Sequence, residues 1–362
     1  MVVFAGGGTG GHLYPAIAIA DALRERCAKI AFIGTADRLE ARIVPTAGYE
    51  LYSISSGSLP RAPSLQLLRS IAANVAGTFQ SLRLLASQQP DLVIATGGYV
   101  CFPVALAARI RRVMRLSRAP LVLLEPNAAP GLTNRLLGPM VDEVWVAPYA
   151  RRSPDPKYRA TGIPIRSTLR TLPRREDAVA RLGLDPSKRT LVAIGGSQGA
   201  RSINDALIRL LREDALPAGW QLFALTGASD FERVRTELRN AREYLDDMSD
   251  AYAVADLVLA RAGASTLGEL AALGKPAILV PYPHAAEGHQ DENAARFAAA
   301  DAAVVLTDAR LADGGLPSLL VQTVEPRRLA ELAEGAARLG GADPLSTILA
   351  RIDMLTARRE NA

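Results

Sequence analysis

The chain has 362 residues, of which 49% are hydrophobic and 5% aromatic, and its formal net charge is +5. This composition excludes a disordered chain, and the length accommodates two domains of about 170 residues each. The two cysteines, Cys27 and Cys101, show no metal-ligand spacing, so neither a disulfide framework nor a zinc site is predicted. No apolar run approaches about 18 residues without a charge, so we expect no signal peptide, no transmembrane helix and a soluble cytoplasmic protein.

The most informative segment is the run GGGTGGH at residues 6–12, directly after the apolar strand predicted at Val2–Ala5. We expect a helix to open at Pro15. A glycine loop between a strand and a helix brings bare backbone N–H groups and the positive end of the helix dipole to one point, where a phosphate or a developing anion is stabilised. His12 adds a titratable base at that point.

An alternative interpretation of this loop is a dinucleotide site, because Gly6, Gly8 and Gly11 satisfy the G-x-G-x-x-G pattern. Such a site also needs an acidic residue after the next strand, and Asp37 is a loose match. A second loop of similar pattern, GGSQGA at residues 195–200, follows another apolar strand. The repeat favours two similar α/β units in tandem.

Short runs rich in Val, Ile and Leu alternate with helical segments along the rest of the chain, which predicts parallel sheets covered on both faces. Beyond the first strand, we expect strands at Ile30–Gly34, Leu92–Ala95, 121–124, 144–146, 191–194, 257–259 and 277–280. We place the hinge near residues 161–164. The expected division is a first domain at 1–162, a second at 163–340 and a final helix at 341–362 that packs back on the first domain.

The basic residues are unevenly distributed: residues 1–165 carry 18 Lys and Arg against 10 Asp and Glu. Many of these arginines lie near an apolar series formed by Leu65, Leu68, Val75, Phe79 and Leu82. One interpretation is that the apolar side chains face the core and the arginines are simply solvated. The other is an apolar patch ringed by arginines on an anionic membrane surface. A nucleic-acid surface is disfavoured, because no aromatic residues interleave with the arginines.

Seven motifs follow one another in a fixed order. They are residues 6–12, GGYV with Pro103 at 97–103, EPNA with PGLTNR at 125–135, TGIPIR at 161–166, GGSQGAR at 195–201, RAGASTLGE at 261–269, and HQ with NA at 289–294. Over essentially the whole chain, they closely resemble the bacterial glycosyltransferases that add N-acetylglucosamine to lipid I in peptidoglycan synthesis. The resemblance implies a GT-B fold of two Rossmann-like, doubly wound parallel-sheet domains.

The resemblance also implies what the protein acts on and where. It implies UDP-N-acetylglucosamine as donor, undecaprenyl-linked lipid I as acceptor, inversion at the anomeric carbon, and neither a cofactor nor a metal. The implied location is the cytoplasmic face of the bacterial cell membrane, as a peripheral protein on its anionic inner surface. The absence of an Asp-x-Asp motif agrees with a metal-free reaction, and we interpret Asp246 and Asp247 as solvated loop residues.

Site residues are carried over by matching the motifs. His12 is the candidate base, and Glu125 is the alternative base, unless it only holds the turn that follows it. The residues expected to bind UDP-N-acetylglucosamine are Thr9, Gly10, Gly11, Asn127, Arg166, Ser197, Leu245, Arg261, Ala264, Ser265, Thr266, Leu267, Gly268, Glu269 and Gln290. Among them, Ser197 and the 264–266 amides serve the diphosphate, Glu269 the ribose, and the Leu245 backbone the uracil. Ser265 and Thr266 also suit a helix N-cap.

The motif pattern departs from that family at Ile163, Pro126 and Ala262, where asparagine, glutamine and serine respectively are more usual. Three alternative functions stay open at this point. They are a related enzyme that glycosylates another membrane lipid such as diacylglycerol, an NAD(P)-dependent oxidoreductase, and a silent UDP-sugar sensor.

Overall fold

The structure is a computed structural model, and it describes residues 1–26, 28–58, 64–150, 153–196, 199–285 and 288–360. The chain divides into two compact units. The first comprises Met1–Arg166 together with Ala342–Ala362, and the second comprises Ser167–Gly341. Each unit is described by itself below.

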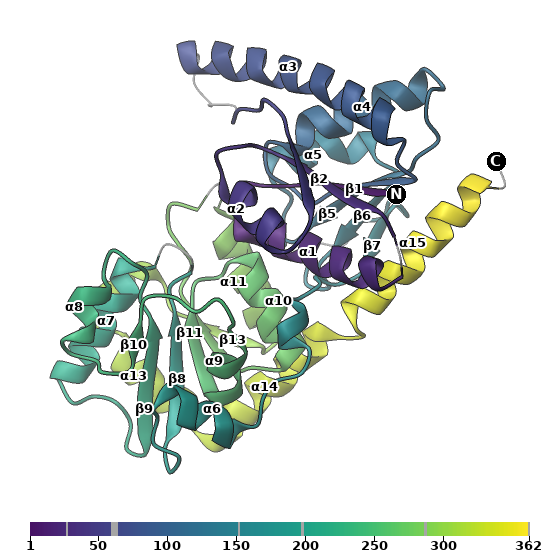
Figure 1. The fold of residues 1–362 in the computed structure, drawn as a ribbon. Helices are drawn as coiled ribbons and strands as arrows, with labels where there is room; N and C mark the ends of the chain where they lie inside the picture. Colours follow the sequence, from purple (N-terminus) through teal and green to yellow (C-terminus); the bar gives the residue numbers. More distant parts are fainter. Residues whose placement is uncertain (27, 59–63, 151–152, 197–198, 286–287, 361–362) are drawn as a thin grey trace. The chain divides into compact units, whose positions relative to one another are not determined.

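The first unit is built on a parallel sheet of seven strands in the order β3-β2-β1-β4-β5-β6-β7 (Figure 1). The strands are β1 (Val2–Ala5), β2 (Ile30–Gly34), β3 (Glu50–Ser53), β4 (Leu92–Ala95), β5 (Leu121–Glu125), β6 (Glu143–Val146) and β7 (Tyr158–Ala160). The helices are α1 (Gly10–Glu25), α2 (Leu39–Thr46), α3 (Leu65–Gln88), α4 (Cys101–Val113), α5 (Leu132–Leu137) and α15 (Pro344–Glu360), with a 3-10 turn at Gly138–Met140. The central strands β1, β4 and β5 are buried along their whole length, because helices cover both faces of a parallel sheet.

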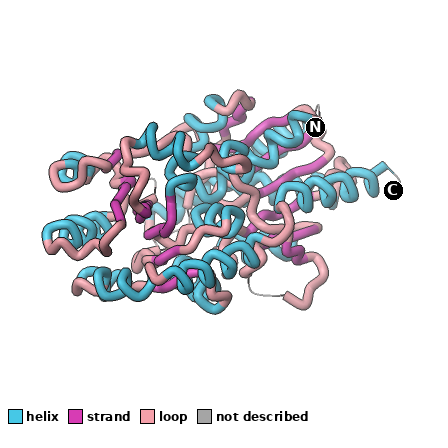
Figure 2. Tube along the Cα trace, turned by 90° about the horizontal axis from the view of Figure 1, so that it is seen from below, coloured by secondary structure: helices cyan, strands magenta, loops and turns pink. Residues whose placement is uncertain are grey.

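The second unit repeats this plan with six parallel strands in the order β10-β9-β8-β11-β12-β13. The strands are β8 (Arg189–Ile194), β9 (Trp220–Leu225), β10 (Ala241–Arg242), β11 (Ala255–Ala260), β12 (Ala277–Leu279) and β13 (Ala303–Val305). The helices are α6 (Arg175–Leu182), α7 (Arg201–Arg212), α8 (Phe231–Arg235), α9 (Ser249–Val254), α10 (Ala264–Leu273), α11 (His289–Ala299), α12 (Asp308–Ala312), α13 (Leu316–Thr323) and α14 (Pro326–Gly340), after a 3-10 turn at Ser167–Leu169. Figure 2 shows strands alternating with helices along the trace.

Both sheets reverse their strand order beside the first strand of the unit, between β1 and β4 and between β8 and β11. This is the doubly wound, Rossmann-like topology, so the predicted fold class is confirmed. In such sheets ligands bind beyond the carboxyl ends of the strands at the reversal point. The two glycine loops follow β1 and β8, so each lies at the reversal point of its own sheet.

The C-terminal helix α15 is part of the first unit. Arg26 at the end of α1 forms an ion pair with Asp353 of α15 at 3.0 Å. Arg351 of α15 forms a second ion pair with the buried Glu143 of β6, which also accepts a 3.0 Å hydrogen bond from the Trp145 indole N–H. Removing one partner of a buried ion pair costs about 3–5 kcal/mol, so the Arg351 contact holds α15 more firmly than the exposed Arg26 contact does.

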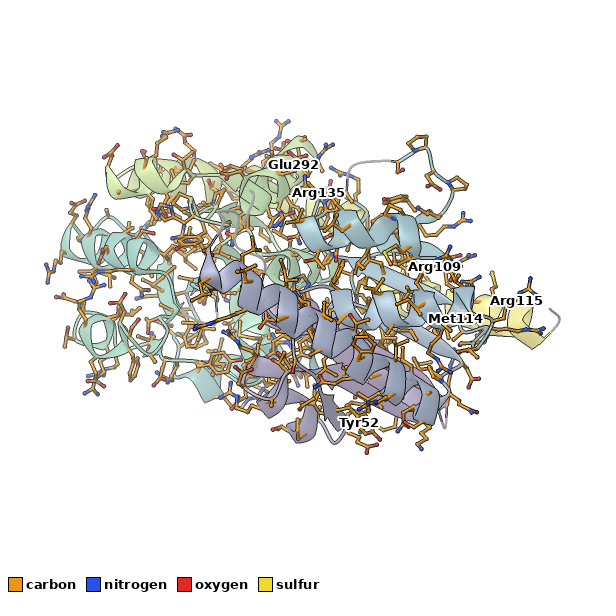
Figure 3. The ribbon with its side chains drawn as sticks, turned by 90° about the horizontal axis from the view of Figure 1, so that it is seen from above. Tyr52, Arg109, Met114, Arg115, Arg135 and Glu292 are labelled. Atoms are coloured by element: carbon orange, nitrogen blue, oxygen red, sulfur yellow. The ribbon has the colours of Figure 1, made fainter. Side chains whose placement is uncertain are left out.

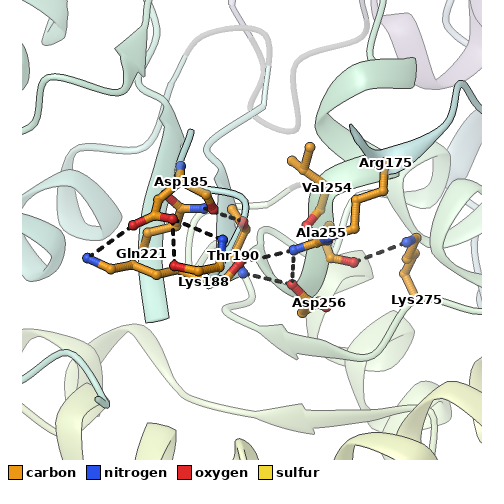
Figure 4. A network of polar contacts seen from close by, with 10 residues as sticks. Arg175, Asp185, Lys188, Thr190, Gln221, Val254, Ala255, Asp256 and Lys275 are labelled. Carbon is orange, nitrogen blue, oxygen red and sulfur yellow. Dashed lines mark hydrogen bonds and ion pairs between the residues drawn. The ribbon is translucent and has the colours of Figure 1, made fainter. Parts of the chain in front are cut away.

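The amino-terminal edge of the second sheet carries a separate polar network (Figure 4). Arg175 donates to Asp256 at 2.9 Å, and Asp256 also accepts the Thr190 N–H at 2.8 Å. Lys275 donates to the Ala255 carbonyl at 3.0 Å, and burial lowers the pKa of its ammonium. A hollow of about 360 Å³ opens beside these residues, at the opposite edge of the sheet from the predicted motifs. The polar side chains beside this hollow bond mainly to neighbouring protein groups, and Asp256 joins the start of β11 to the start of β8.

Candidate active site

Helix α1 begins at Gly10, five residues before the expected start at Pro15, so that expectation was wrong. Proline is favoured in the first turn of a helix, and Pro15 lies further in, where it removes the hydrogen bond to the Gly11 carbonyl and its ring crowds that carbonyl. The N-cap is Thr9, whose carbonyl accepts the His12 N–H at 3.3 Å. Gly10, Gly11 and His12 therefore form the first turn of α1.

The His12 ring is held by the loop that follows β4. Its Nδ1 lies 2.9 Å from the carbonyl oxygen of Thr96. A carbonyl can only accept a hydrogen bond, so the neutral imidazole carries its proton on Nδ1 and its lone pair on Nε2. The backbone of Gly97 lies directly against the ring. Its φ is +108°, and a Cβ there would lie 2.3 Å from Nδ1. The tautomer that a general base needs is thus imposed by the backbone at the end of β4.

The first glycine loop packs against two side chains that the sequence analysis did not single out. A Cβ at Gly6 would lie 2.1 Å from the Thr96 hydroxyl, and one at Gly7 would lie 2.4 Å from the Glu40 carboxylate. Gly8 has a φ of +84°, and its N–H donates to Glu40 Oε2 at 2.9 Å. The expectation that this loop presents bare N–H groups is therefore wrong for Gly8, because a buried carboxylate needs hydrogen-bond donors and takes this one.

Glu125 ends β5 and is only 2% exposed. Its Oε1 accepts the backbone N–H of Asn127 at 2.9 Å and the Asn127 side-chain amide at 3.0 Å, and its Oε2 accepts the Asn134 amide at 2.6 Å. Burial raises the pKa of the Glu125 carboxyl, and these donors oppose that rise. The carboxylate thus organises the turn at 126–134.

In the second unit, α10 provides the helix N-terminus that the motif predicted, with a different cap. The helix begins at Ala264 after the N-cap Gly263, so Ser265 and Thr266 lie within the first turn, and their expected capping role is wrong. The Ser265 hydroxyl is buried and has no hydrogen-bond partner among the described residues. A helix N-terminus with an unsatisfied hydroxyl in its first turn is suited to an anion.

The second glycine loop lies before α7. Gly196 and Gly199 have φ values of +85° and +76°, and a Cβ at Gly199 would lie 2.2 Å from the backbone oxygen of Thr226. Its glycines are thus required by backbone conformation and by close backbone approach. The predicted Ser197 lies outside the described residues.

The predicted Glu269 is buried on α10, where its Oε2 accepts the Tyr252 hydroxyl at 2.6 Å. Tyr252 is fully buried on α9 and was not among the predicted residues. Leu267 and Gly268 are buried within α10 as well, and the Leu267 side chain belongs to the core.

The predicted Arg261, at the end of β11, is bonded to the protein itself. Its side chain is 12% exposed and donates to Asp308 at 2.5 Å, to the Ser202 hydroxyl at 2.8 Å, and to the carbonyls of Val280 and Pro281. The guanidinium thus joins the start of α7 to the loops that follow β11, β12 and β13. No sequence signal pointed to Ser202 or Asp308.

The remaining predicted residues lie in loops and first turns. Gln290 accepts the backbone N–H of Tyr282 through Oε1 at 2.9 Å, which holds the loop after β12. Leu245 is half-buried in the loop between β10 and α9. The Arg166 guanidinium lies over the Tyr14 ring of α1, 5.0 Å from its centroid, and Arg166 belongs to the first unit although the expected boundary assigned it to the second.

Helix α3 exposes apolar side chains and buries mainly small and polar ones, which is the opposite of an ordinary surface helix. The side chains Leu65, Leu68, Ile71, Val75 and Phe79 are exposed, and we call them the α3 apolar face. The buried side of the helix is lined mainly by Ser70, Asn74, Gly77, Thr78 and Ser81. The core-facing interpretation of the apolar series was therefore wrong, except for Leu82, which packs partly against the core.

Exposed apolar residues are also found at the end of α4 and just after it, at Val113, Met114 and Leu116. Figure 3 views this side of the unit, with Arg109, Met114 and Arg115 labelled. Arg109 and Arg115 are exposed beside these apolar side chains. Within the described part of the chain, no helix is both long enough and apolar enough to cross a membrane.

The chain matches known protein families along most of its length. Residues 2–146 match the glycosyltransferase family 28 N-terminal domain, and residues 190–343 match the glycosyltransferase family 28 C-terminal domain. Two curated relatives carry the name UDP-N-acetylglucosamine–N-acetylmuramyl-(pentapeptide) pyrophosphoryl-undecaprenol N-acetylglucosamine transferase. The protein from Halothermothrix orenii is 39% identical, with 94% of each chain covered, and that from Chlorobium luteolum is 40% identical, with 97% of this chain and 98% of the relative covered.

Solved structures show the same fold. The crystal structure of Acinetobacter baumannii MurG aligns with a TM-score of 0.76 at 24% identity, covering 98% of this chain and 99% of that one. The calicheamicin glycosyltransferase CalG4 aligns with a TM-score of 0.71 at 17% identity, covering 99% and 98% respectively. The two matched domains and the near full-length relatives lead to one conclusion: this chain belongs to glycosyltransferase family 28.

Proposed function

We propose that the protein transfers N-acetylglucosamine from UDP-N-acetylglucosamine to the 4-hydroxyl of the N-acetylmuramoyl group of undecaprenyl-linked lipid I, which forms lipid II for peptidoglycan synthesis. The observation that carries this proposal is the likeness, over 94% or more of both chains, to two transferases of that name. An inverting transfer needs a base for the acceptor hydroxyl and a stabilising site for the departing diphosphate.

His12 is the base in this proposal. Its Nε2 removes the proton of the acceptor hydroxyl while that oxygen attacks the anomeric carbon, and the bond from this carbon to the UDP oxygen breaks. The Nδ1–H bond to the Thr96 carbonyl orients the ring and stabilises the imidazolium that forms. Glu125 fits a positioning role better, because hydrogen bonds from Asn127 and Asn134 already occupy both of its oxygens.

The second unit supplies the nucleotide site in this proposal. The first turn of α10, with the buried hydroxyl of Ser265, stabilises the diphosphate through amide N–H groups and the helix dipole. Glu269, oriented by the Tyr252 hydroxyl, accepts hydrogen bonds from the ribose. Gln290 of this unit reads the sugar hydroxyls, and Arg261 supports the site by holding its loops. Asn127, which belongs to the first unit, is proposed for the sugar hydroxyls as well.

The α3 apolar face and the arginines beside it support peripheral binding to the anionic cytoplasmic face of the cell membrane. Exposed apolar patches of this kind mark interaction surfaces, and each arginine near an anionic lipid surface contributes about 1 kcal/mol. The acceptor is itself a membrane lipid, so this location gives the enzyme access to it.

A transfer assay tests the proposal directly. The purified protein is given radiolabelled UDP-N-acetylglucosamine with either a lipid I analogue or diacylglycerol, and His12→Ala serves as the inactive control. We expect label in the lipid I product alone. Transfer to diacylglycerol would show a different lipid acceptor, and donor binding without any transfer would show a sugar sensor. Binding of NAD(P) without UDP binding would show an oxidoreductase.

A further inference from the structure

Glu40, in the first turn of α2, is fully buried directly beneath the first glycine loop. Its Oε2 accepts the Gly8 N–H at 2.9 Å, and its Oε1 accepts both the backbone N–H of Thr35 at 3.1 Å and the Thr35 hydroxyl at 2.6 Å. No ion pair within the described residues involves Glu40, so neutral donors alone satisfy this carboxylate.

Two glycines make room for the Glu40 side chain. A Cβ at Gly7 would lie 2.4 Å from a Glu40 carboxylate oxygen, and a Cβ at Gly34 would lie 2.7 Å from Glu40 Cγ. Neither Gly7 nor Gly34 has a positive φ, so the close approach of Glu40, and not backbone conformation, requires glycine at both positions. The first loop is thus shaped around a carboxylate.

The second glycine loop is shaped differently. The nearest atoms to a Cβ at Gly195 would be backbone atoms of Ala200 and Gly199, and those at Gly199 would be backbone atoms of Thr226 and Gly227. Gly196 is the counterpart of Gly7 in the shared pattern, and a Cβ there would meet nothing within 4 Å among the described residues. The buried carboxylate that follows β9, Asp230, accepts the Asn204 amide at 3.0 Å and forms an ion pair with Arg233 at 3.1 Å. The two loops share a sequence pattern, but a carboxylate packs against Gly7 and no described residue packs against a Cβ at Gly196.

We propose that Glu40 is a built-in anion that positions the first glycine loop and prevents it from binding phosphate. The carboxylate takes the Gly8 N–H, which an empty loop of this pattern would offer to a phosphate, and its charge repels a second anion a few ångströms away. The position beside the Gly8 N–H is thereby suited to a neutral hydroxyl group and not to a phosphate. Only the identity of that hydroxyl, as part of the acceptor, rests on the proposed function.

Glu40→Gln tests this proposal, because glutamine has the same length and can still accept from Thr35 through Oε1. Its amide nitrogen cannot accept the Gly8 N–H, and the charge is lost. Inorganic phosphate is titrated by calorimetry into the protein saturated with UDP, which occupies the nucleotide site. We expect phosphate to bind Glu40→Gln at least about tenfold more tightly than it binds the wild type, the factor that one charge-assisted hydrogen bond provides.

Asp21→Asn is the matched control, because it removes a carboxylate from α1 of the same unit, where Asp21 accepts the Tyr49 hydroxyl at 2.6 Å. We expect its phosphate affinity to equal that of the wild type. In the transfer assay, phosphate should inhibit Glu40→Gln in competition with the acceptor, and kcat should fall while the KM for the donor is unchanged. Equal phosphate affinity in all three proteins would overturn the proposal.

A second measurement needs no variant. Crystals of the wild type soaked with phosphate should show no density at the Gly8 N–H, and phosphate bound there would refute the anion-exclusion role. Neither phosphate measurement requires a transfer reaction. A negative result therefore counts against the role of Glu40 and not against the proposed transferase activity.

Discussion

Gly97→Ala is the sharpest test of how the fold prepares His12. The backbone of Gly97 has a φ of +108°, and an added Cβ would lie 2.3 Å from His12 Nδ1. The unfavourable φ costs about 1–3 kcal/mol of folding stability. The methyl group also forces the ring away from the Thr96 carbonyl and breaks a hydrogen bond worth about 0.5–1.5 kcal/mol.

The effect on catalysis should exceed the effect on stability. A displacement of about 1 Å at a reacting group lowers the rate about 10²-fold, and complete loss of a general base lowers it by about 10²–10⁴-fold. We expect kcat of Gly97→Ala to fall within that range, with the Kd for UDP unchanged. Turnover is measured with radiolabelled donor, UDP affinity by calorimetry and stability by urea unfolding.

Gly183→Ala is the matched control. Gly183 also has a positive φ, +70°, but a Cβ there meets nothing within 4 Å. It should lose about 1–2 kcal/mol of stability and retain wild-type turnover. If Gly97→Ala retains wild-type turnover, or loses UDP affinity as strongly as it loses turnover, then Gly97 does not set the position of the His12 ring.

Further predictions concern the base, the nucleotide site, metal independence and the membrane surface. His12→Ala should lower kcat by about 10²–10⁴-fold at unchanged UDP affinity; near-normal turnover would instead direct attention to Glu125. Glu269→Ala should weaken UDP and UDP-N-acetylglucosamine equally, by about 2–4 kcal/mol in calorimetry, and an effect on the sugar nucleotide alone would contradict the ribose assignment. Transfer should survive exhaustive chelation by EDTA, because the α10 N-terminus supplies the positive potential at the diphosphate; loss restored by magnesium or manganese would oppose this. Leu68→Ser combined with Phe79→Ser should reduce sedimentation with anionic vesicles without changing the rate on a soluble acceptor analogue, and unchanged sedimentation would show that the α3 apolar face does not bind lipid.

The strands that the sequence predicted are the central ones of both sheets. β1, β2, β4, β5, β6, β8, β11 and β12 were all expected, because a strand buried on both faces reads as a short uninterrupted apolar run. The strands β3, β7, β10 and β13, which are partly exposed at or near the edges, were not expected. They are two to four residues long; β3, β7 and β10 mix polar with apolar side chains, and β13 is an apolar run of only three residues, so periodicity alone does not reveal them. The longer β9 was missed as well, because Gln221 interrupts its apolar run.

For helix α3, the sequence did not show which face of the helix is buried. The apolar series that the sequence analysis noted recurs at helical spacing along this helix. The spacing cannot say which face is turned inward. Only the packed structure shows that Asn74 and Ser81 lie on the buried side while Leu68 and Phe79 are exposed, because burial depends on the neighbours that the helix meets.

The sequence by itself determined the repeated strand–glycine loop–helix units, the order of the motifs and the presence of His12 at the end of the first loop. These features are local, because a strand, a turn and a helix start are set by residues adjacent in the chain. The tertiary structure alone decided which nitrogen of His12 carries the proton and what lies beneath each glycine. The His12 ring meets the Thr96 carbonyl across 84 residues, and Gly8 meets Glu40 across 32. Those contacts exist because β1 lies between β2 and β4 in the sheet, which brings the loops after three strands to one place.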